Sequence, residues 1–179
     1  MALRYEDLDE RTRQFMLEEV ERDANQGNLY ISPRLNELGR HYFERILGEA
    51  VREHDDEWLA GEQRYHGYLK AQEQRRTRSG SYTTARVPNT APDTLAEGEF
   101  NQFYVRGLCR RAIEENVPEV EVFRARMSSR PRPESEAMID KRISAQALLE
   151  DLRESQGVEP ALGLPSGPNS GLSIRLPQS

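Results

Sequence analysis

Cysteine, lysine and long apolar stretches are scarce in this chain of 179 residues. Its single cysteine, Cys109, excludes an intramolecular disulfide and a metal cage built from cysteines. No apolar stretch approaches the roughly 18 residues that a membrane-spanning helix requires, and the first residues lack the apolar segment of a signal peptide. We therefore expect a cytoplasmic protein that does not engage a membrane.

The residue patterns of common catalytic and cofactor sites are also missing. There is no phosphate-binding or dinucleotide-binding glycine motif, and none of the three histidines accompanies a nucleophile elbow. The stretch 54–57, HDDE, places potential metal ligands side by side, but adjacent helical residues point about 100° apart and cannot converge on one ion. The sequence identifies no catalytic residue, and we predict neither a cofactor nor a metal.

Hydrophobic residues make up 36% of the chain and charged residues 31%. This balance predicts a modest core with large solvated faces. The pattern of apolar residues favours an α+β fold that is mainly helical, with about five helices and two or three short strands in a small sheet.

Residues 1–70 form the N-terminal helical part of this prediction. The first helix begins at a capping box of Asp7 and Glu10. The second begins at Ser32, with Pro33 at its first helical position and Leu38 on its buried stripe. A third helix is capped by Asp55.

Residues 94–157 complete one domain with the N-terminal part. Thr94 and Glu97 have capping-box spacing and predict the start of the most strongly patterned helix. One face of this helix is apolar and includes Phe100, Phe103, Tyr104 and Leu108, and Cys109 lies beside that face. The alternating residues 119–125 predict a half-exposed strand, and a last short helix is capped by Ser144.

Residues 158–179 are rich in proline, glycine and serine and form an arm. Within it, residues 171–176 alternate, which places Leu172, Ile174 and Leu176 on one face of a short strand. We expect this strand to add to a sheet edge, beside residues 119–125 of its own chain or on a partner.

Charge is divided into blocks along the chain. Residues 1–69 hold 9 basic and 16 acidic side chains, residues 70–132 hold 12 and 8, and residues 133–179 hold 4 and 7. The central basic block contains residues 71–93, a basic connector or hairpin. We predict that its exposed cations contact an anion or a partner; the candidates are Arg75, Arg76, Arg78, Tyr82, Arg86, Arg124, Arg126, Arg130 and Arg132.

Three classes of function follow from these observations. The first is a non-enzymatic interaction or assembly protein, a homo-oligomer or a subunit of a larger complex, because oppositely charged blocks suit subunit pairing. The second is a nucleic-acid-associated protein that uses the arginine connector, which the net charge of −6 and the pI of about 5.3 disfavour. The third is an enzyme with a carboxylate and arginine site that only the fold assembles.

Overall fold

The structure is a computed structural model of the chain and describes residues 3–127, 131–157, 160–164 and 170–178. In chain order the elements of this part are α1 (Glu10–Asn25), α2 (Glu37–Glu53), α3 (Asp56–Tyr65), β1 (Gln72–Arg76), β2 (Tyr82–Arg86), α4 (Ala91–Glu114), β3 (Glu119–Arg124), α5 (Pro133–Glu136), β4 (Arg142–Ser144), α6 (Ala145–Glu154) and β5 (Leu172–Arg175). The mainly helical α+β prediction is confirmed.

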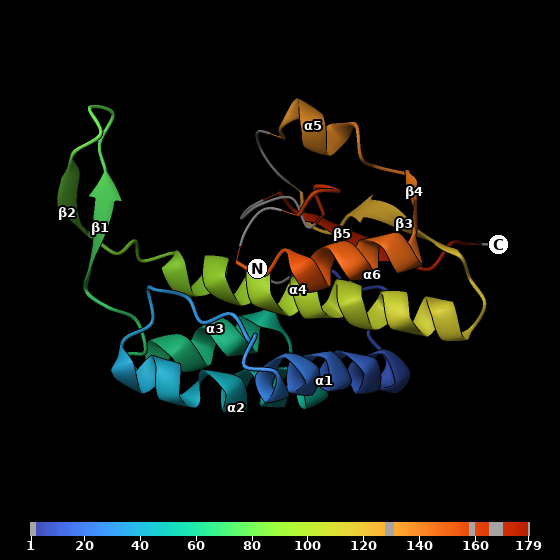
Figure 1. Ribbon diagram of the computed structural model, residues 1–179, viewed down its shortest axis with the longest axis horizontal. Coiled ribbons are helices and arrows are strands. Elements are labelled where there is room, and N and C mark those ends of the chain that lie inside the picture. Colours follow the sequence, from blue (N-terminus) through green and yellow to red (C-terminus); the bar gives the residue numbers. More distant parts are fainter. Residues whose placement is uncertain (1–2, 128–130, 158–159, 165–169, 179) are drawn as a thin grey trace.

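Helix α4 lies between two layers (Figure 1). On one side it packs on α1 and α3, and α2 completes that layer. On the other side lie α6 and an antiparallel sheet with the strand order β4-β3-β5. The hairpin β1–β2 projects from one end of the molecule. None of the helices in the described ranges combines the length and the apolar content needed to cross a bilayer.

The predicted face of α4 is buried, and Phe100, Phe103 and Tyr104 are at most 1% exposed. The helix begins at Ala91, however, three residues before the predicted capping box. Pro92 lies in its first turn, where a missing N–H costs nothing. The Thr94 hydroxyl donates to the carbonyl oxygen of Thr90 at 3.1 Å instead of capping a helix.

The predicted start of the second helix is also wrong. Residues Ser32 to Leu35 form a turn and a bridge to Leu69, and α2 begins after Asn36, whose side chain accepts from the Gly39 N–H at 2.8 Å. Leu38, predicted to be buried, is consequently 51% exposed.

Of the other predicted helix caps, two are confirmed and one is wrong. Asp55 and Ser144 cap α3 and α6 as predicted, accepting from backbone N–H groups three residues on. Helix α1 is capped by Asp9, not Asp7. Asp7 instead accepts a hydrogen bond from the backbone N–H of Leu176, at 2.8 Å, and so fixes the end of the C-terminal arm.

Strand β5 pairs antiparallel with β3 of the same chain, with Val122 opposite Ile174. Leu172 and Ile174 are fully buried, and Leu176 is partly buried against the core. The Asn101 side chain on α4 donates to the carbonyl oxygen of Leu172 at 2.9 Å and accepts from the Ser173 hydroxyl at 2.7 Å. Of the two edges proposed from the sequence, the strand occupies the one in its own chain.

A buried ion cluster joins α1 to α4. Arg106 has no exposed surface, and its guanidinium donates to Glu19 at 2.6 and 2.9 Å and to Asp23, both equally buried. Arg153 of α6 donates to Glu19 as well, at 3.0 Å. Burial alone would raise the pKa of Glu19, but hydrogen bonds from Arg153 and Arg106 hold that pKa below its ordinary value.

Gly107 lets α1 and α4 approach closely beside this cluster. A Cβ atom at this position would lie 2.5 Å from the Cγ atom of Met16 and 2.9 Å from its backbone nitrogen. The backbone of α1 therefore occupies the space of a side chain on α4, and any larger residue must separate the helices.

We predict that Gly107→Ala lowers the free energy of unfolding by about 1–3 kcal/mol, because the added methyl group overpacks the interface. Gly98→Ala is the matched control on the same helix, where a Cβ atom meets nothing within 4 Å. It should raise the free energy of unfolding by about 0.5–1 kcal/mol. Urea denaturation measures both, and a shift of the same sign in both variants contradicts the close-packing account.

We also predict that Arg106→Met lowers the free energy of unfolding by about 3–5 kcal/mol, because it removes the fully buried cation that pairs with both Glu19 and Asp23. Arg11→Met is the control, since it removes exposed pairs with Glu114 and Glu115 that also join α1 to the end of α4. That change should cost less than about 1 kcal/mol. Equal losses in the two denaturation curves would show that the buried cluster has no special weight.

Candidate functional site

The hairpin β1–β2 is the first of two candidate sites. Its strands pair antiparallel with Gln72 opposite Arg86 and Arg76 opposite Tyr82. No residue of either strand is buried. In the described part of the chain neither strand packs on a helix, and the hairpin stands clear of the body (Figure 1). Because a two-stranded ribbon without an apolar face is only marginally stable in water, this element is a candidate for contact with a partner.

Four of the predicted cations lie on this hairpin. Side chains alternate between its faces, so Arg76, Tyr82 and Arg86 share one face, and Tyr82 is 72% exposed. Arg78 lies in the turn, and Arg75 on the other face is bound to Glu73 at 2.8 Å. Arg76, Arg78 and Arg86 have no carboxylate partner among the residues that the structure describes.

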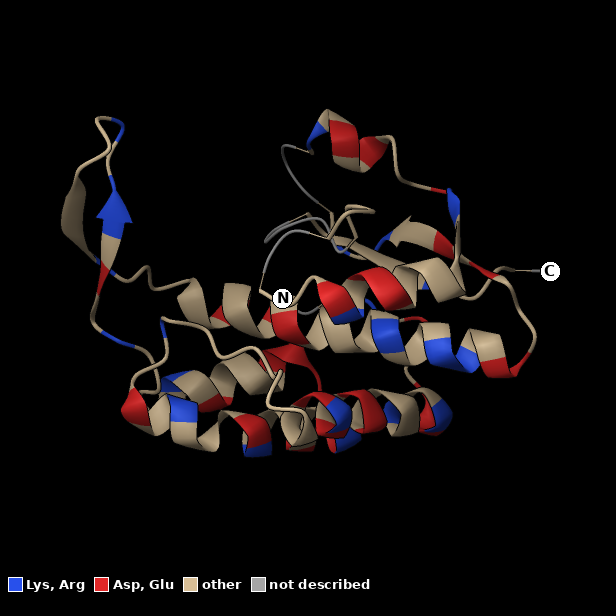
Figure 2. Ribbon diagram, in the orientation of Figure 1, with Lys and Arg blue, Asp and Glu red and all other residues tan. Residues whose placement is uncertain are grey.

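The remaining predicted arginines lie elsewhere. Arg124 pairs with Glu136 and donates to the Ser170 carbonyl oxygen at 3.1 Å, and Arg126 pairs with Glu97. Arg132 is exposed, and Arg130 falls outside the described residues. Figures 1 and 2 place β3 and α5, which flank these residues in sequence, well apart from the hairpin, so the structure does not join the two groups into one arginine surface.

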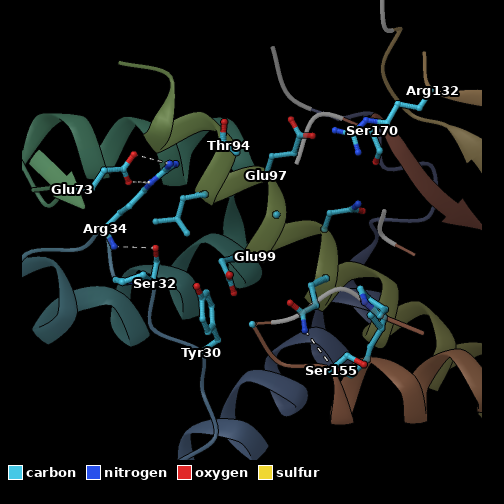
Figure 3. A pocket seen from close by; sticks show the side chains of 18 residues that line it. Tyr30, Ser32, Arg34, Glu73, Thr94, Glu97, Glu99, Arg132, Ser155 and Ser170 are labelled. Atoms are coloured by element: carbon cyan, nitrogen blue, oxygen red, sulfur yellow. Dashed lines mark hydrogen bonds and ion pairs between the residues drawn. The ribbon is translucent and has the colours of Figure 1, made fainter. Parts of the chain in front are cut away.

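A cleft of about 590 Å³ is the second candidate site. It lies between the segment that precedes α2, the base of β1, the first half of α4 and the residues after α6 (Figure 3). Tyr30, Leu95 and Leu152 supply apolar surface, and Glu99 and Arg132 are among its polar groups. This volume and mixed lining are typical of sites for small organic ligands.

Glu99 is the unusual group of the cleft. It is 7% exposed, and no described residue donates a hydrogen bond to it or forms an ion pair with it. Burial raises its pKa to about 8, and the positive charge of Arg106 only partly opposes this rise. At neutral pH the fold therefore holds a neutral carboxylic acid at the wall of an open cleft.

Several other polar groups around the cleft have partners. Arg34 donates to Glu73 at 2.7 and 3.1 Å, and the Ser155 hydroxyl donates to Asp151 at 3.0 Å. These bonds tie the segment before α2 to β1 and close the end of α6. These bonds fix parts of the cleft wall, and the side chains of Glu99 and the exposed Arg132 have no partner among the described residues.

Cys109 is a structural residue, as the phase of its helix predicts. It is fully buried, and burial raises the pKa of its thiol far above the ordinary value. The thiolate that a nucleophile requires is therefore not formed at neutral pH.

Sequence reasoning missed Glu99, although a signal was present. Glu99, Phe103 and Arg106 recur at the spacing of one helical stripe, and Glu99 stands directly before Phe100 on an apolar face. An acidic residue inside the apolar face of a central helix lowers the stability of the fold unless it is paired. An unpaired one is therefore a candidate for a functional residue.

Comparison of the chain with protein-family models, with curated proteins and with solved structures gives no match. The hairpin and the cleft are therefore the observations from which function is inferred.

We predict that Glu99→Gln stabilises the fold in a pH-dependent way. The pKa of Glu99 is raised in the folded state from its ordinary 4.5, so its contribution to stability is intact at low pH and is lost as the pH rises toward 8. The glutamine variant should match the wild type near pH 4.5 and exceed it by about 3–4 kcal/mol at pH 7.5. Urea denaturation at both pH values measures this, and a pH-independent difference would contradict the raised pKa.

Proposed function

We propose that this protein is a non-enzymatic, self-assembling interaction protein of the cytoplasm whose β1–β2 hairpin binds the acidic helical layer of a second copy. The observation that carries the proposal is the hairpin itself, a two-stranded ribbon with no buried residue and no helix packed on it. Such a ribbon gains stability from a partner surface that its own chain does not provide.

Charge complementarity supports a second copy as the partner. Arg76, Arg78 and Arg86 present planar donors that pair well with carboxylates. Residues 1–69, which contain α1 to α3, carry 16 acidic against 9 basic side chains. Exposed carboxylates on this layer include Glu21, Glu44 and Glu53 (Figure 2 shows the acidic residues of these helices).

The geometry of such a contact has a consequence for the assembly. The hairpin of one copy and the helical layer of the next are different surfaces. If two copies exchange hairpins reciprocally, the contact forms twice in a two-fold dimer, and if they do not, its repetition yields a closed ring or an open chain. Because the contact depends on exposed charges, it weakens as salt is added.

Binding of nucleic acid is the second candidate function. It is favoured by the face that carries Arg76 and Arg86, because Gln72, Gln74 and Thr84 lie on it too. A two-stranded ribbon fits the major groove of duplex DNA, and arginine and glutamine side chains hydrogen-bond base edges there. The net charge of −6 weakens this candidate relative to the first.

The test reverses two hairpin charges. We predict that the wild type is an oligomer at about 50 mM salt and dissociates at about 500 mM, and that the double variant Arg76→Glu/Arg86→Glu is monomeric at both concentrations. Size-exclusion chromatography with light scattering measures the mass. Lys141→Glu/Arg142→Glu is the matched control, since both residues are exposed and lie on or beside β4, away from the hairpin.

Two outcomes would overturn the proposal. One is a wild type that remains monomeric at low salt and high protein concentration. The other is an assembly that both double variants retain or lose equally. Titration of a labelled DNA duplex in the same buffers addresses the second candidate: salt-sensitive binding by a monomer, lost only in the hairpin variant, would replace the first candidate with it.

A further inference from the structure

The described charged groups that line the cleft form ion pairs, except for Glu99 and Arg132. Arg34 is bound to Glu73, and Glu97 is bound to Arg126. The side-chain amide of Asn101, two residues after Glu99 on α4, is hydrogen-bonded to Leu172 and Ser173. Glu99 alone among the described carboxylates of the lining has no cation or hydrogen-bond donor.

Arg132 is the one described cation of the lining without a carboxylate partner, and it forms no ion pair with Glu99 in the described part of the chain. On α4, the guanidinium of Arg106 is committed to Glu19 and Asp23 in the buried cluster. From the segment before α2, Arg34 points to Glu73 on β1, as the dashed lines in Figure 3 show. Arg132 lies at another part of the rim, near Ser170, and Tyr30 is the labelled side chain beside Glu99 (Figure 3).

Tyr30 gives the cleft an aromatic wall next to this carboxyl group (Figure 3). Gly157, after α6, leaves room for the ring: a Cβ atom at Gly157 would lie 2.6 Å from two ring carbons of Tyr30. Leu95 and Leu152 add aliphatic surface. An aromatic face near a carboxylate attracts cations, because the ring quadrupole and the negative charge act in the same sense.

We propose that the cleft binds an organic cation, a primary amine or guanidine on an apolar body, with its charged group on Glu99 and its body against Tyr30, Leu95 and Leu152. The cleft borders only the base of the hairpin, and this proposal does not depend on the function proposed for the hairpin. The ligand supplies the hydrogen-bond donor and the positive charge that no described residue gives to Glu99. Neither a neutral ligand nor an anion would compensate the carboxylate that forms when Glu99 loses its proton.

Binding in this way releases a proton. The free protein holds Glu99 as a neutral acid, and the cation is paired with its carboxylate, so the carboxyl proton passes to the solvent when the ligand enters. Affinity for a cation therefore increases as the pH approaches 8 from below. Binding of a neutral molecule to the protonated acid would show the opposite dependence.

The experiment compares three probes with the same indole ring: tryptamine, tryptophol and indole-3-acetate, which end in an amine, an alcohol and a carboxylate. Isothermal titration calorimetry at about pH 8 should give tryptamine an affinity at least about tenfold higher than either other probe. The affinity for tryptamine should rise severalfold between about pH 6.5 and pH 8. Titrations in buffers of different ionisation enthalpy should report the released proton.

Glu99→Gln should lower the affinity for tryptamine by about tenfold or more and abolish its pH dependence. Glu154→Gln is the matched control, because it removes the same charge from an exposed position next to the residues that line the cleft. It should leave binding unchanged. Thermal unfolding of both variants confirms that they are folded.

The proposal is overturned if tryptophol or indole-3-acetate binds as well as tryptamine, or if tryptamine does not bind at millimolar concentration. It is also overturned if the two glutamine variants weaken binding equally, because the cation would then respond to the general charge of the surface and not to Glu99. The comparison of probes on the wild type stands without any variant.

Discussion

The rest of the structure depends on the burial of Arg106 against Glu19 and Asp23. Taking three charged groups out of water is tolerable only when each finds its partners at hydrogen-bonding distance, so the cluster permits one relative position of α1 and α4. Gly107, the next residue, lets the backbone of α1 come close enough for those bonds to form. Arg153 then ties α6 to the same carboxylate, and one electrostatic constraint thereby places three helices.

Helix α4 carries two buried ionisable residues whose removal is expected to change stability in opposite directions. Arg106 is buried but fully paired, and its removal is expected to destabilise the protein. Glu99, seven residues earlier, is buried without a described partner, and its neutralisation is expected to stabilise the protein. A buried group that lowers stability where a glutamine would not is the kind of residue that functional sites retain, and Glu99 lies in the wall of a cleft of about 590 Å³.

Prediction from the sequence was reliable where structure is local. The helical segments, the strand at β3, the buried Cys109 and the alternation of β5 each depend on spacing within a few residues, and they were found. The starts of α2 and α4 were not, because several residues near each start have capping side chains. Asn36, and not Ser32, caps α2, because the residues between them form a turn and a bridge to Leu69. Thr94 does not cap α4, because the helix already begins at Ala91 with Pro92 in its first turn.

The sequence by itself determined a mainly helical chain with a basic hairpin segment and a final strand, because side-chain periodicity and capping act over distances that the local pattern contains. Only the tertiary structure decided that Arg106 is an interior ion, that the final strand lies on β3, and that Glu99 faces a cleft. Arg106 and Glu19 are 87 residues apart in the chain, and Asn101 and Leu172 are 71 apart. Contacts between residues so far apart in the chain form through tertiary packing, and the sequence pattern around one residue does not indicate the other.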